Sequence, residues 1–298
     1  MNIENLTQHF GDKFISEVSL KNFSWFKIGG IAKYLFTPHS IEDLTFFLQN
    51  KPLNLKIYTI GAGSNLLIPD KFLDYCIIKL NYLNTINIVD NDFIECEAGA
   101  MNSSLCAFAL NHNYGGFEFS SGIPGSVGGG VAMNAGAFDS EFAKIVNKVY
   151  ALDYQGNKLE FNNIDMGFAY RKNSLSFPVV FYKVIFKTFK STTNEITAKL
   201  NNIKLLREAN QPKKVLTGGS TFANPLPHKA WELIDKVGLR GYRIGGAKYS
   251  EKHCNFIIND NNACYDDIKN LIIEAKNKVK AQFNIDLHTE IKILEEII

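Results

Sequence analysis

The sequence has almost no excess of charge of either sign. Its 32 basic residues are nearly balanced by 30 acidic ones, which leaves a formal charge of +2 over 298 residues. Proteins that bind nucleic acid or an anionic membrane through surface charge are usually strongly basic, at least locally. We therefore expect no nucleic acid and no membrane as a partner, and an anion bound by this chain must be held by local groups.

Long apolar runs are also missing. No run approaches the roughly 18 residues that are needed to span a membrane. The first residues, MNIENLTQHFGDKF, lack the apolar core of a signal peptide. These absences predict a cytoplasmic protein.

The sequence contains no C-x-x-C pair, and its histidines have no mutual spacing that suggests a metal site. Its cysteines are odd in number and lie in apolar segments, which is typical of buried, reduced thiols. We therefore expect no bound metal and no disulfide framework. The cysteines are Cys76, Cys96, Cys106, Cys254 and Cys264.

The pattern of apolar and polar residues predicts an α+β fold. The length suggests about two domains, and 46% hydrophobic with 21% charged residues is typical of a soluble globular chain. Ser40 with Asp43 is expected to cap a helix near 41–50, and Asn102 to cap another near 103–112. Apolar alternation predicts strands at 55–60, 75–80, 84–89, 93–98, 146–153 and 179–188.

The character of the sequence changes after residue 190. Thr192 and Glu195 form a capping box ahead of a helix that extends to about residue 208, and we place a domain boundary there. The pattern beyond it predicts a short helix after Pro227 and then a strand at NFIIND. A long helix with one apolar face follows, and the tail LHTEIKIL alternates like a strand.

The glycines form neither of the two common phosphate-binding motifs. Gly61 and Gly63 follow an apolar strand, but a G-x-G-x-x-G fingerprint needs a third glycine where Leu66 stands. Pro69 also interrupts the helix that should follow, and no G-x-x-x-x-G-K-[ST] sequence is present. A Rossmann fingerprint and a P-loop are therefore excluded, and GAGSN taken alone is typical of a plain turn.

Glycine is instead concentrated in SSGIPGSVGGGVAMNAGA at 120–137, which holds six of the 22 glycines and no charged residue. This composition resembles a flexible linker, but apolar residues such as Val131 favour an ordered, close-packed loop. Together with GAGSN, the loop could surround a pyrophosphate with backbone amides. The alternative is tight packing of a helix on a sheet. The pair Gly29-Gly30, taken alone, indicates only a bulge or a turn.

Six blocks occur in a fixed order, and a late glutamate follows them. The blocks are WFKIGG (25–30), GAGSNLL (61–67), GIPGSVGGGVAMNAGA (122–137), YRKNS (170–174), GGSTFANP (218–225), and GGA with S-x-x-H-x-N-F-I-I-N (245–259). From about residue 20 to the end, this set resembles the UDP-N-acetylenolpyruvoylglucosamine reductase (MurB) family. The chain is similar to the shorter form of that family, which lacks a tyrosine-bearing loop.

The resemblance implies an α+β fold with two domains. A two-part FAD-binding domain of the vanillyl-alcohol-oxidase type would comprise residues 1–195, with the tail 285–298 returning to it. A smaller α+β substrate-binding domain would comprise residues 196–284. The residues implied to bind FAD are Ile28, Gly29, Gly61, Gly63, Ser64, Asn65, Leu66, Gly122, Ile123, Gly125, Ser126, Val127, Gly129, Asn134, Ala135, Gly136 and Ala137.

The resemblance also implies a reaction. A reductase of this family uses NADPH and FAD to reduce the enolpyruvyl group of UDP-N-acetylglucosamine enolpyruvate to UDP-N-acetylmuramate, in peptidoglycan synthesis. Arg171 would face the substrate carboxyl and the enolate oxygen, Glu290 would be the second electrostatic partner at the enolate, and Ser220 would donate the proton. The residues implied to bind the substrate are Tyr170, Arg207 and Asn224.

Several alternatives stay open at this stage. YRKNS is one residue longer than the Y-R-x-S form, so the role of Ser174 is open. Taken without the resemblance, Arg171 is typical of a surface salt bridge, Ser220 of a turn and Glu290 of a solvated strand. An FAD oxidase or dehydrogenase on the same cofactor fold, and a nucleotide-binding module without catalysis, are the rival functions. We expect a monomer.

Overall fold

The computed structural model describes residues 1–90 and 93–294. The chain forms two compact units, and each of them is assembled from separate stretches of sequence. The first unit comprises Met1–Val18, Lys33–Ala62 and Asp74–Leu205, and the second comprises Ser19–Ala32, Gly63–Leu73 and Leu206–Ile298. In the described part of the chain, none of the helices has the length and apolar character that crossing a membrane requires.

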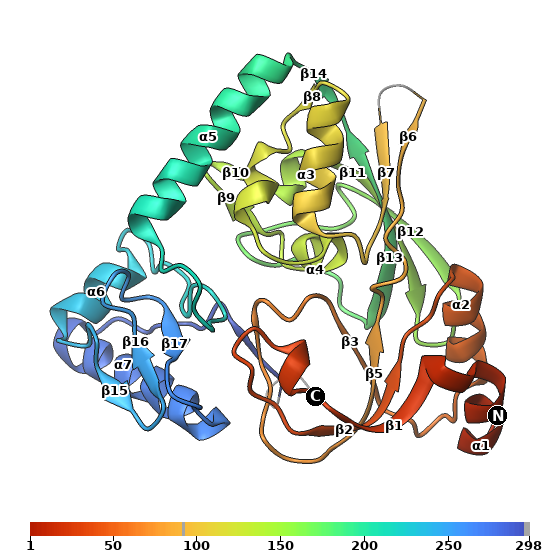
Figure 1. The fold of residues 1–298 in the computed structure, drawn as a ribbon, viewed down its shortest axis with the longest axis horizontal. Helices are drawn as coiled ribbons and strands as arrows, with labels where there is room; N and C mark the ends of the chain where they lie inside the picture. Colours follow the sequence, from red (N-terminus) through yellow and green to blue (C-terminus); the bar gives the residue numbers. More distant parts are fainter. Residues whose placement is uncertain (91–92, 295–298) are drawn as a thin grey trace. The chain divides into compact units, whose positions relative to one another are not determined.

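The first unit contains two large sheets (Figure 1). One has four strands in the order β1-β2-β5-β3, and β3 runs parallel to β5. The other has five antiparallel strands in the order β12-β11-β13-β7-β6. The bounds are β1 (Phe14–Ser19), β2 (Ile31–Phe36), β3 (Ile57–Ile60), β5 (Leu73–Lys79), β6 (Ile86–Val89), β7 (Phe93–Glu97), β11 (Val146–Asp153), β12 (Lys158–Asn162) and β13 (Val179–Lys187).

Each sheet of the first unit has its own apolar core, to which helices contribute. Helices α1 (Ile3–Phe10) and α2 (Ile41–Asn50) share a core with the four-stranded sheet, where the rings of Phe36 and Phe47 stack with centroids 4.2 Å apart. Helices α3 (Asn102–Asn111) and α4 (Val127–Ala132) contribute Leu105 and Val131 to the core of the five-stranded sheet. The other elements are α5 (Thr193–Asn210), β8 (Tyr114–Gly115), β9 (Gly136–Ala137), β10 (Ser140–Glu141), β14 (Phe189–Lys190) and the short 3-10 helices η1 (Gly11–Lys13), η3 (Glu118–Gly122) and η4 (Phe142–Lys144).

The second unit is built around a three-stranded antiparallel sheet in the order β15-β16-β17. Helix α7 (Tyr265–Phe283) contributes Ile268, Leu271 and Val279 to a core that it shares with this sheet and with α6 (Ala230–Lys236). Strand β18, the last among the described residues, pairs in parallel with β4. The remaining bounds are η2 (Lys21–Phe23), β4 (Leu66–Leu67), β15 (Arg243–Ile244), β16 (Ala247–Tyr249), β17 (Ile257–Asn259) and β18 (Lys292–Ile293).

Two of the three predicted helix caps are confirmed. Ser40 accepts a hydrogen bond from the Asp43 N–H (3.1 Å), and Thr192 and Glu195 bond to each other's backbone N–H in a capping box. The predicted cap at Asn102 is wrong, because Met101 precedes the helix and no side chain caps it. Asn102 instead donates its amide to the Ile123 carbonyl (3.1 Å), a contact that lies outside its own helix.

The cysteines are all free in the structure. Four of them are buried, as predicted, but Cys264 is exposed, and there the prediction is wrong. Its side chain accepts a hydrogen bond from the N–H of Asp267 and so caps α7. Among the described residues, there is no group of three or more His, Cys, Asp or Glu side chains that could hold a metal ion.

The domain boundaries stay a prediction. The tail was predicted to return to the FAD-binding domain, and in the structure β18 pairs with β4, which belongs to the GAGSNLL block. Both strands belong to the second compact unit. Compactness alone does not show which ligand a unit binds. The domain boundary at residue 195 therefore stays a prediction.

Candidate active site

The glycine-rich stretch is ordered, as the sequence analysis favoured. Gly125 has φ +140°, a conformation that glycine adopts more readily than any other residue, and its carbonyl accepts a hydrogen bond from the Asn102 N–H (3.0 Å). Ser126 then begins the short helix α4, where its side chain accepts a hydrogen bond from the Gly129 N–H (3.4 Å). Asn102 thus holds this loop in place through both its backbone and its amide.

A cavity in the first unit is lined by residues from two of the predicted FAD-binding blocks. It measures about 200 Å³, and Gly61, Ser126, Gly128 and Gly129 are among its lining residues. The two blocks approach each other closely, because a Cβ on Gly61 would lie 2.6 Å from the Ser126 Oγ. Val127, by contrast, is fully buried and its N–H donates to the Ala100 carbonyl (2.8 Å), so its contribution to a cofactor site stays a prediction.

Several FAD-binding residues predicted in the second unit are closely packed against other residues of that unit. A Cβ on Gly63 would lie 1.8 Å from the Phe23 carbonyl oxygen, so the backbone has no room for a side chain there. Ile28 belongs to the apolar core, and the Gly29 N–H donates to Asp70 (3.1 Å). Leu66 lies in β4, and Ser64 directly precedes Asn65 in the same block. These positions agree with the packing alternative, and their contact with a cofactor stays a prediction.

Arg171 lies at the tip of a tight turn in the first unit. Ala169 and Lys172 close the turn with two backbone hydrogen bonds of 3.0 and 3.2 Å, and Arg171 has φ +57°, which is unusual for a residue with a side chain. Its guanidinium donates to the Gly136 carbonyl (2.7 Å) and lies 4.8 Å from the centre of the Tyr170 ring. Because a residue with a side chain favours negative φ, the surrounding structure must hold Arg171 in this conformation.

The segment 134–137 supports this turn. Asn134 is fully buried, and its amide donates to the Ala169 carbonyl (3.0 Å) while its oxygen accepts from the Ala143 N–H (2.9 Å). The Ala135 N–H donates to the Gly130 carbonyl (2.8 Å), and Gly136 and Ala137 form strand β9. In the preceding loop, the Ile123 N–H donates to Ser120 (3.0 Å) and Gly122 ends a 3-10 helix. The structure therefore brings the predicted cofactor segment 134–137 and the predicted catalytic Arg171 together.

Ser220 and Glu290 are brought together within the second unit. The Glu290 N–H donates to the Thr221 carbonyl (2.8 Å), and the Ala223 N–H donates to the His288 carbonyl (2.9 Å), so the two segments lie side by side. Glu290 was expected on a strand, but it lies in a bend before β18, because that strand has only two residues. The Asn65 amide donates to the Glu290 carbonyl (3.1 Å) and adds part of the GAGSNLL block to the same cluster.

Asn255 fixes the backbone that follows Ser220. Its amide makes two hydrogen bonds with Phe222, from the Phe222 N–H (2.9 Å) and to the Phe222 carbonyl (2.8 Å). The Asn255 carbonyl also accepts from the Thr221 N–H (2.7 Å). Asn255 itself is only 4% exposed. A single buried side chain thus holds the Ser220 segment.

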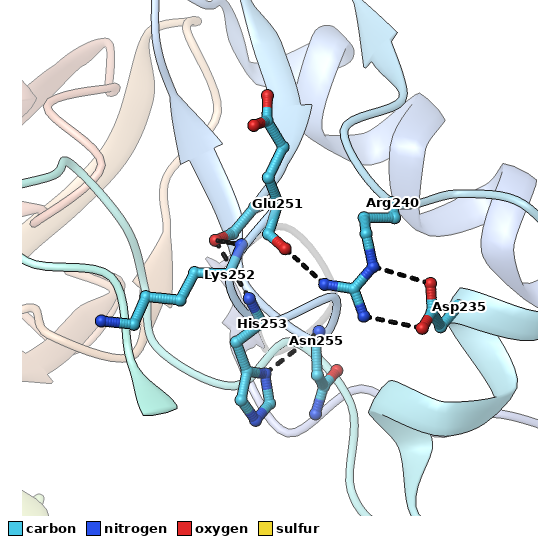
Figure 2. Close-up of polar contacts among 7 residues, drawn as sticks. Asp235, Arg240, Glu251, Lys252, His253 and Asn255 are labelled. Atoms are coloured by element: carbon cyan, nitrogen blue, oxygen red, sulfur yellow. Dashed lines mark hydrogen bonds and ion pairs between the residues drawn. The ribbon is translucent and has the colours of Figure 1, made fainter. Parts of the chain in front are cut away.

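The loop that carries Asn255 is itself held by polar contacts (Figure 2). His253 Nδ1 accepts from the Asn255 N–H (3.3 Å), and burial lowers the pKa of His253, which keeps the ring neutral and able to accept. On the other side of the loop, Arg240 donates to the Glu251 carbonyl and forms an ion pair with Asp235 (2.6 Å). These contacts hold the loop on both of its sides.

The two other predicted substrate residues in the second unit have separate surroundings. Asn224 Oδ1 accepts from the Ala230 N–H (3.0 Å), which leaves its NH₂ as the group that could donate to a phosphate. Arg207 lies in α5, where burial lowers the pKa of its guanidinium. In the first unit, Ser174 donates to the Met166 carbonyl (3.4 Å), a structural contact that leaves its catalytic role untested.

Replacing Asn255 by alanine is expected to lower the free energy of unfolding by about 2–4 kcal/mol. Two buried backbone groups of Phe222 would lose their partner, and each costs free energy when it is left unsatisfied. Urea denaturation measures this change. Asn261→Ala, which removes an exposed amide in the same unit, is the control and is expected to have little effect. An unchanged midpoint for Asn255→Ala would contradict its role in holding the segment.

Two family models match the chain. One, described as the UDP-N-acetylenolpyruvoylglucosamine reductase C-terminal domain, matches residues 211–294, and the other, an FAD binding domain, matches residues 32–162. A curated UDP-N-acetylenolpyruvoylglucosamine reductase from Rickettsia peacockii is 46% identical over 282 residues, which cover 94% of this chain and 95% of the relative. The chain belongs to the UDP-N-acetylenolpyruvoylglucosamine reductase family. The reductase of that name from Rickettsia felis is 45% identical over 95% of this chain and 96% of its own length.

Solved structures of other proteins share the fold of this chain. The crystal structure of UDP-N-acetylenolpyruvylglucosamine reductase (MurB) from Thermus caldophilus superposes with a TM-score of 0.81 at 29% identity, covering 93% of this chain and 98% of that chain. A structure of berberine bridge enzyme superposes with a TM-score of 0.50 at 14% identity, covering 64% of this chain and 43% of that chain, and this likeness concerns the fold alone. The predicted α+β fold, with an FAD-binding domain of the vanillyl-alcohol-oxidase type, is confirmed.

The cavity in the first unit of the reductase fits part of FAD. A Cβ on Gly129 would have only the Ser126 Oγ within 4 Å, at 3.4 Å, so the backbone borders open space there. Thr59 also lines the cavity, and its buried hydroxyl has no hydrogen-bond partner among the described residues. Sites for whole drug-sized ligands measure about 300–1,000 Å³. A cavity of about 200 Å³ therefore suits one portion of the dinucleotide.

Two residues with clear positions near these sites were missed by the sequence analysis. Asn255 was noted only as part of a motif, and Lys79, at the end of a predicted strand, was not considered. Apart from its apolar neighbours, the local sequence does not distinguish Lys79 from a surface lysine. The hydrophobic context YCIIKL was the only available signal, because a lysine that ends an apolar strand is often partly buried.

Proposed function

We propose that this chain reduces the enolpyruvyl group of UDP-N-acetylglucosamine enolpyruvate to give UDP-N-acetylmuramate, with FAD as cofactor and NADPH as the source of hydride. This is a step in the synthesis of peptidoglycan precursors. The observation that carries the proposal is the pairing of the Ser220 segment with Glu290, in which the Glu290 N–H donates to the Thr221 carbonyl (2.8 Å). The segments of the proposed proton donor and of the proposed carboxylate thus lie side by side in a member of this reductase family.

The cofactor and the chain have separate tasks in this reaction. When bound, FAD would accept hydride from NADPH and then donate it to the substrate. The residues that would hold it are the predicted set in the two glycine-bearing blocks, with Gly61, Ser126 and Gly129 at the cavity. The chain must also stabilise negative charge on the substrate and deliver a proton to one of its carbons.

Ser220 would deliver that proton. Addition of hydride to the terminal vinyl carbon leaves an enolate, which is a strong base and can take a proton from a weakly acidic hydroxyl. Ser220 is half-buried and its position is fixed by the hydrogen bonds of Asn255 to the two residues that follow it. Protonation from one fixed hydroxyl would place the new hydrogen on one face of the carbon.

Arg171 and Glu290 would act on the charge that develops next to the substrate carboxylate. A guanidinium is planar, permanently charged and able to donate to two oxygens, which suits a carboxylate and an adjacent enolate oxygen. The Gly136 carbonyl and the turn of Ala169–Lys172 hold Arg171 in place before the substrate binds. Preorganised charge of this kind lowers the barrier without reorganisation during the reaction.

Tyr170, Arg207 and Asn224 are proposed to bind the substrate. Tyr170 is 52% exposed, and its ring lies beside the Arg171 guanidinium, so it borders the position proposed for the carboxylate. Asn224 and Arg207 would donate to the phosphates of UDP. A cytoplasmic location and a monomeric state are proposed as well.

The decisive experiment is anaerobic stopped-flow spectroscopy on purified protein, in two halves. NADPH is expected to bleach the flavin, and UDP-N-acetylglucosamine enolpyruvate is expected to restore its absorbance. Reduced flavin that ignores this substrate would contradict the proposed function. Reduction by an alcohol or hydroxy acid without a preference for NADPH would support the oxidase or dehydrogenase, and a protein that is colourless or does not undergo reduction would support a binding module.

A further inference from the structure

The cavity of the first unit contains one charged lining residue among those that the structure describes. Lys79 lies at the end of β5, next to the end of β3, where Ile60 and Lys79 are paired in the parallel register. The other lining residues include Thr59, Gly61, Ser126 and Gly129, together with apolar side chains such as Phe181. A half-buried ammonium group therefore faces a space that is otherwise uncharged.

Lys79 is held at the glycine loop itself. Its Nζ donates to the Gly61 carbonyl at 3.1 Å. Because a Cβ on Gly61 would lie 2.6 Å from the Ser126 Oγ, both glycine-bearing blocks lie close to the carbonyl that receives the ammonium. The charge is thus placed where the two blocks meet.

The ammonium of Lys79 is partly removed from solvent. Burial lowers the pKa of Lys79, which means that its surroundings disfavour the charged form. Thr59, on the neighbouring strand, adds a buried hydroxyl without a hydrogen-bond partner among the described residues. An anionic ligand with several oxygen atoms would stabilise the ammonium and accept a hydrogen bond from the hydroxyl.

We propose that Lys79 binds the diphosphate of FAD in this cavity and supplies the positive charge that the glycine-bearing blocks lack. The proposal rests on the proposed function for the identity of the ligand. The sequence analysis considered only backbone amides as groups that could surround the pyrophosphate. We assign part of this binding to the Lys79 side chain, which lies outside all six sequence blocks. The Thr59 hydroxyl donates to the same diphosphate.

Replacing Lys79 by methionine is expected to weaken FAD binding by about 10- to 100-fold, the effect of losing one charge-assisted hydrogen bond. Methionine has similar length and no charge, so it suits the partly buried position. Lys79→Arg keeps the charge and is expected to bind FAD more tightly than Lys79→Met. The measurement is a titration of flavin-free protein with FAD, followed by the quenching of flavin fluorescence.

The matched control is Lys33→Met. Lys33 lies on β2 of the same sheet, but it is exposed and paired with Asp74 (2.7 Å). Such surface pairs contribute little to stability, and this variant is expected to bind FAD as the parent protein does. A thermal melt of each flavin-free variant separates ligand binding from folding. Lys79→Met is expected to melt at or above the parent midpoint, because it removes a buried charge.

The pH dependence gives an independent readout. The FAD complex favours the ammonium form of Lys79, so the affinity of the parent protein should fall as the pH rises through the Lys79 pKa in the complex. The affinity of Lys79→Met should change less over the same pH range. Addition of ADP to flavin-free protein should raise the parent melting midpoint more than adenosine does, and this difference should shrink in Lys79→Met.

The outcomes separate this proposal from the proposed function. A parent protein that binds no FAD would contradict the proposed function. A parent that binds FAD while Lys79→Met binds it equally tightly, or keeps the full difference between ADP and adenosine, would overturn the role of Lys79 alone. A flavin-free Lys79→Met that melts well below the parent would show instead that the lysine serves the fold by holding Gly61.

Discussion

Replacement of Ser220 by alanine is expected to slow the reoxidation of reduced flavin by UDP-N-acetylglucosamine enolpyruvate by about 10²- to 10⁴-fold. Bleaching of the flavin by NADPH should stay largely unchanged. The proton is required only when the substrate carbon is protonated, so only that half of the reaction loses its donor. The fold should not change, because the backbone bridge between Ser220 and Phe256 does not depend on the hydroxyl.

Two further variants make this test specific. Ser220→Cys keeps a transferable proton at the same position and should recover part of the lost rate. Thr7→Ala removes an exposed hydroxyl of α1 that donates to the Ile3 carbonyl, and it should leave both halves of the reaction nearly unchanged. Equal slowing of both halves in Ser220→Ala would remove Ser220 from the role of proton donor.

Local sequence signals predicted the long helices well. The capping residues Ser40 and Thr192 act within three residues of their own position, so the sequence alone contains the whole interaction. Asn102 has the same chemistry, but its amide bonds to Ile123, 21 residues away, and the helix begins without it. A preference for capping is overridden when a bond to a distant backbone group fixes the orientation of the side chain.

The glycines show a second limit of sequence reasoning. A Cβ on Gly63 would lie 1.8 Å from the Phe23 carbonyl oxygen, and one on Gly30 would lie 2.0 Å from the Lys71 carbonyl oxygen, so both are required by packing. Gly129 borders open space on the cavity instead. Packing and ligand binding both select glycine, and the sequence does not distinguish them until the neighbours are known.

Long-range contacts explain what else was missed at the site. Asn255 bonds to Phe222 across 33 residues, and Lys79 bonds to Gly61 across 18. Neither partner is implied by spacing along the chain. The resemblance to a known family supplied Arg171, Ser220 and Glu290, but it could not supply the residues that hold them.

Replacement of Gly129 by valine is expected to give a folded protein that cannot retain flavin. The new side chain would project beside the cavity, where only the Ser126 Oγ lies within 4 Å of its Cβ. FAD would have to share this space with the valine side chain. The variant protein should therefore bind FAD at least about 100-fold more weakly than the parent protein. Flavin absorbance after purification and a titration with FAD measure the effect, and the melting midpoint of the flavin-free protein should stay close to the parent value.

The adjacent glycine provides the matched contrast. A Cβ on Gly130 would lie 2.5 Å from the Phe142 ring, which is fully buried in the core, so Gly130→Val should destabilise the fold by about 1–3 kcal/mol or more. The two substitutions are chemically identical and one residue apart, yet one should remove the cofactor and the other should damage the core. A yellow Gly129→Val protein with parental affinity for FAD would show that the whole glycine-rich stretch serves packing, and the cavity would then have to be assigned to another ligand.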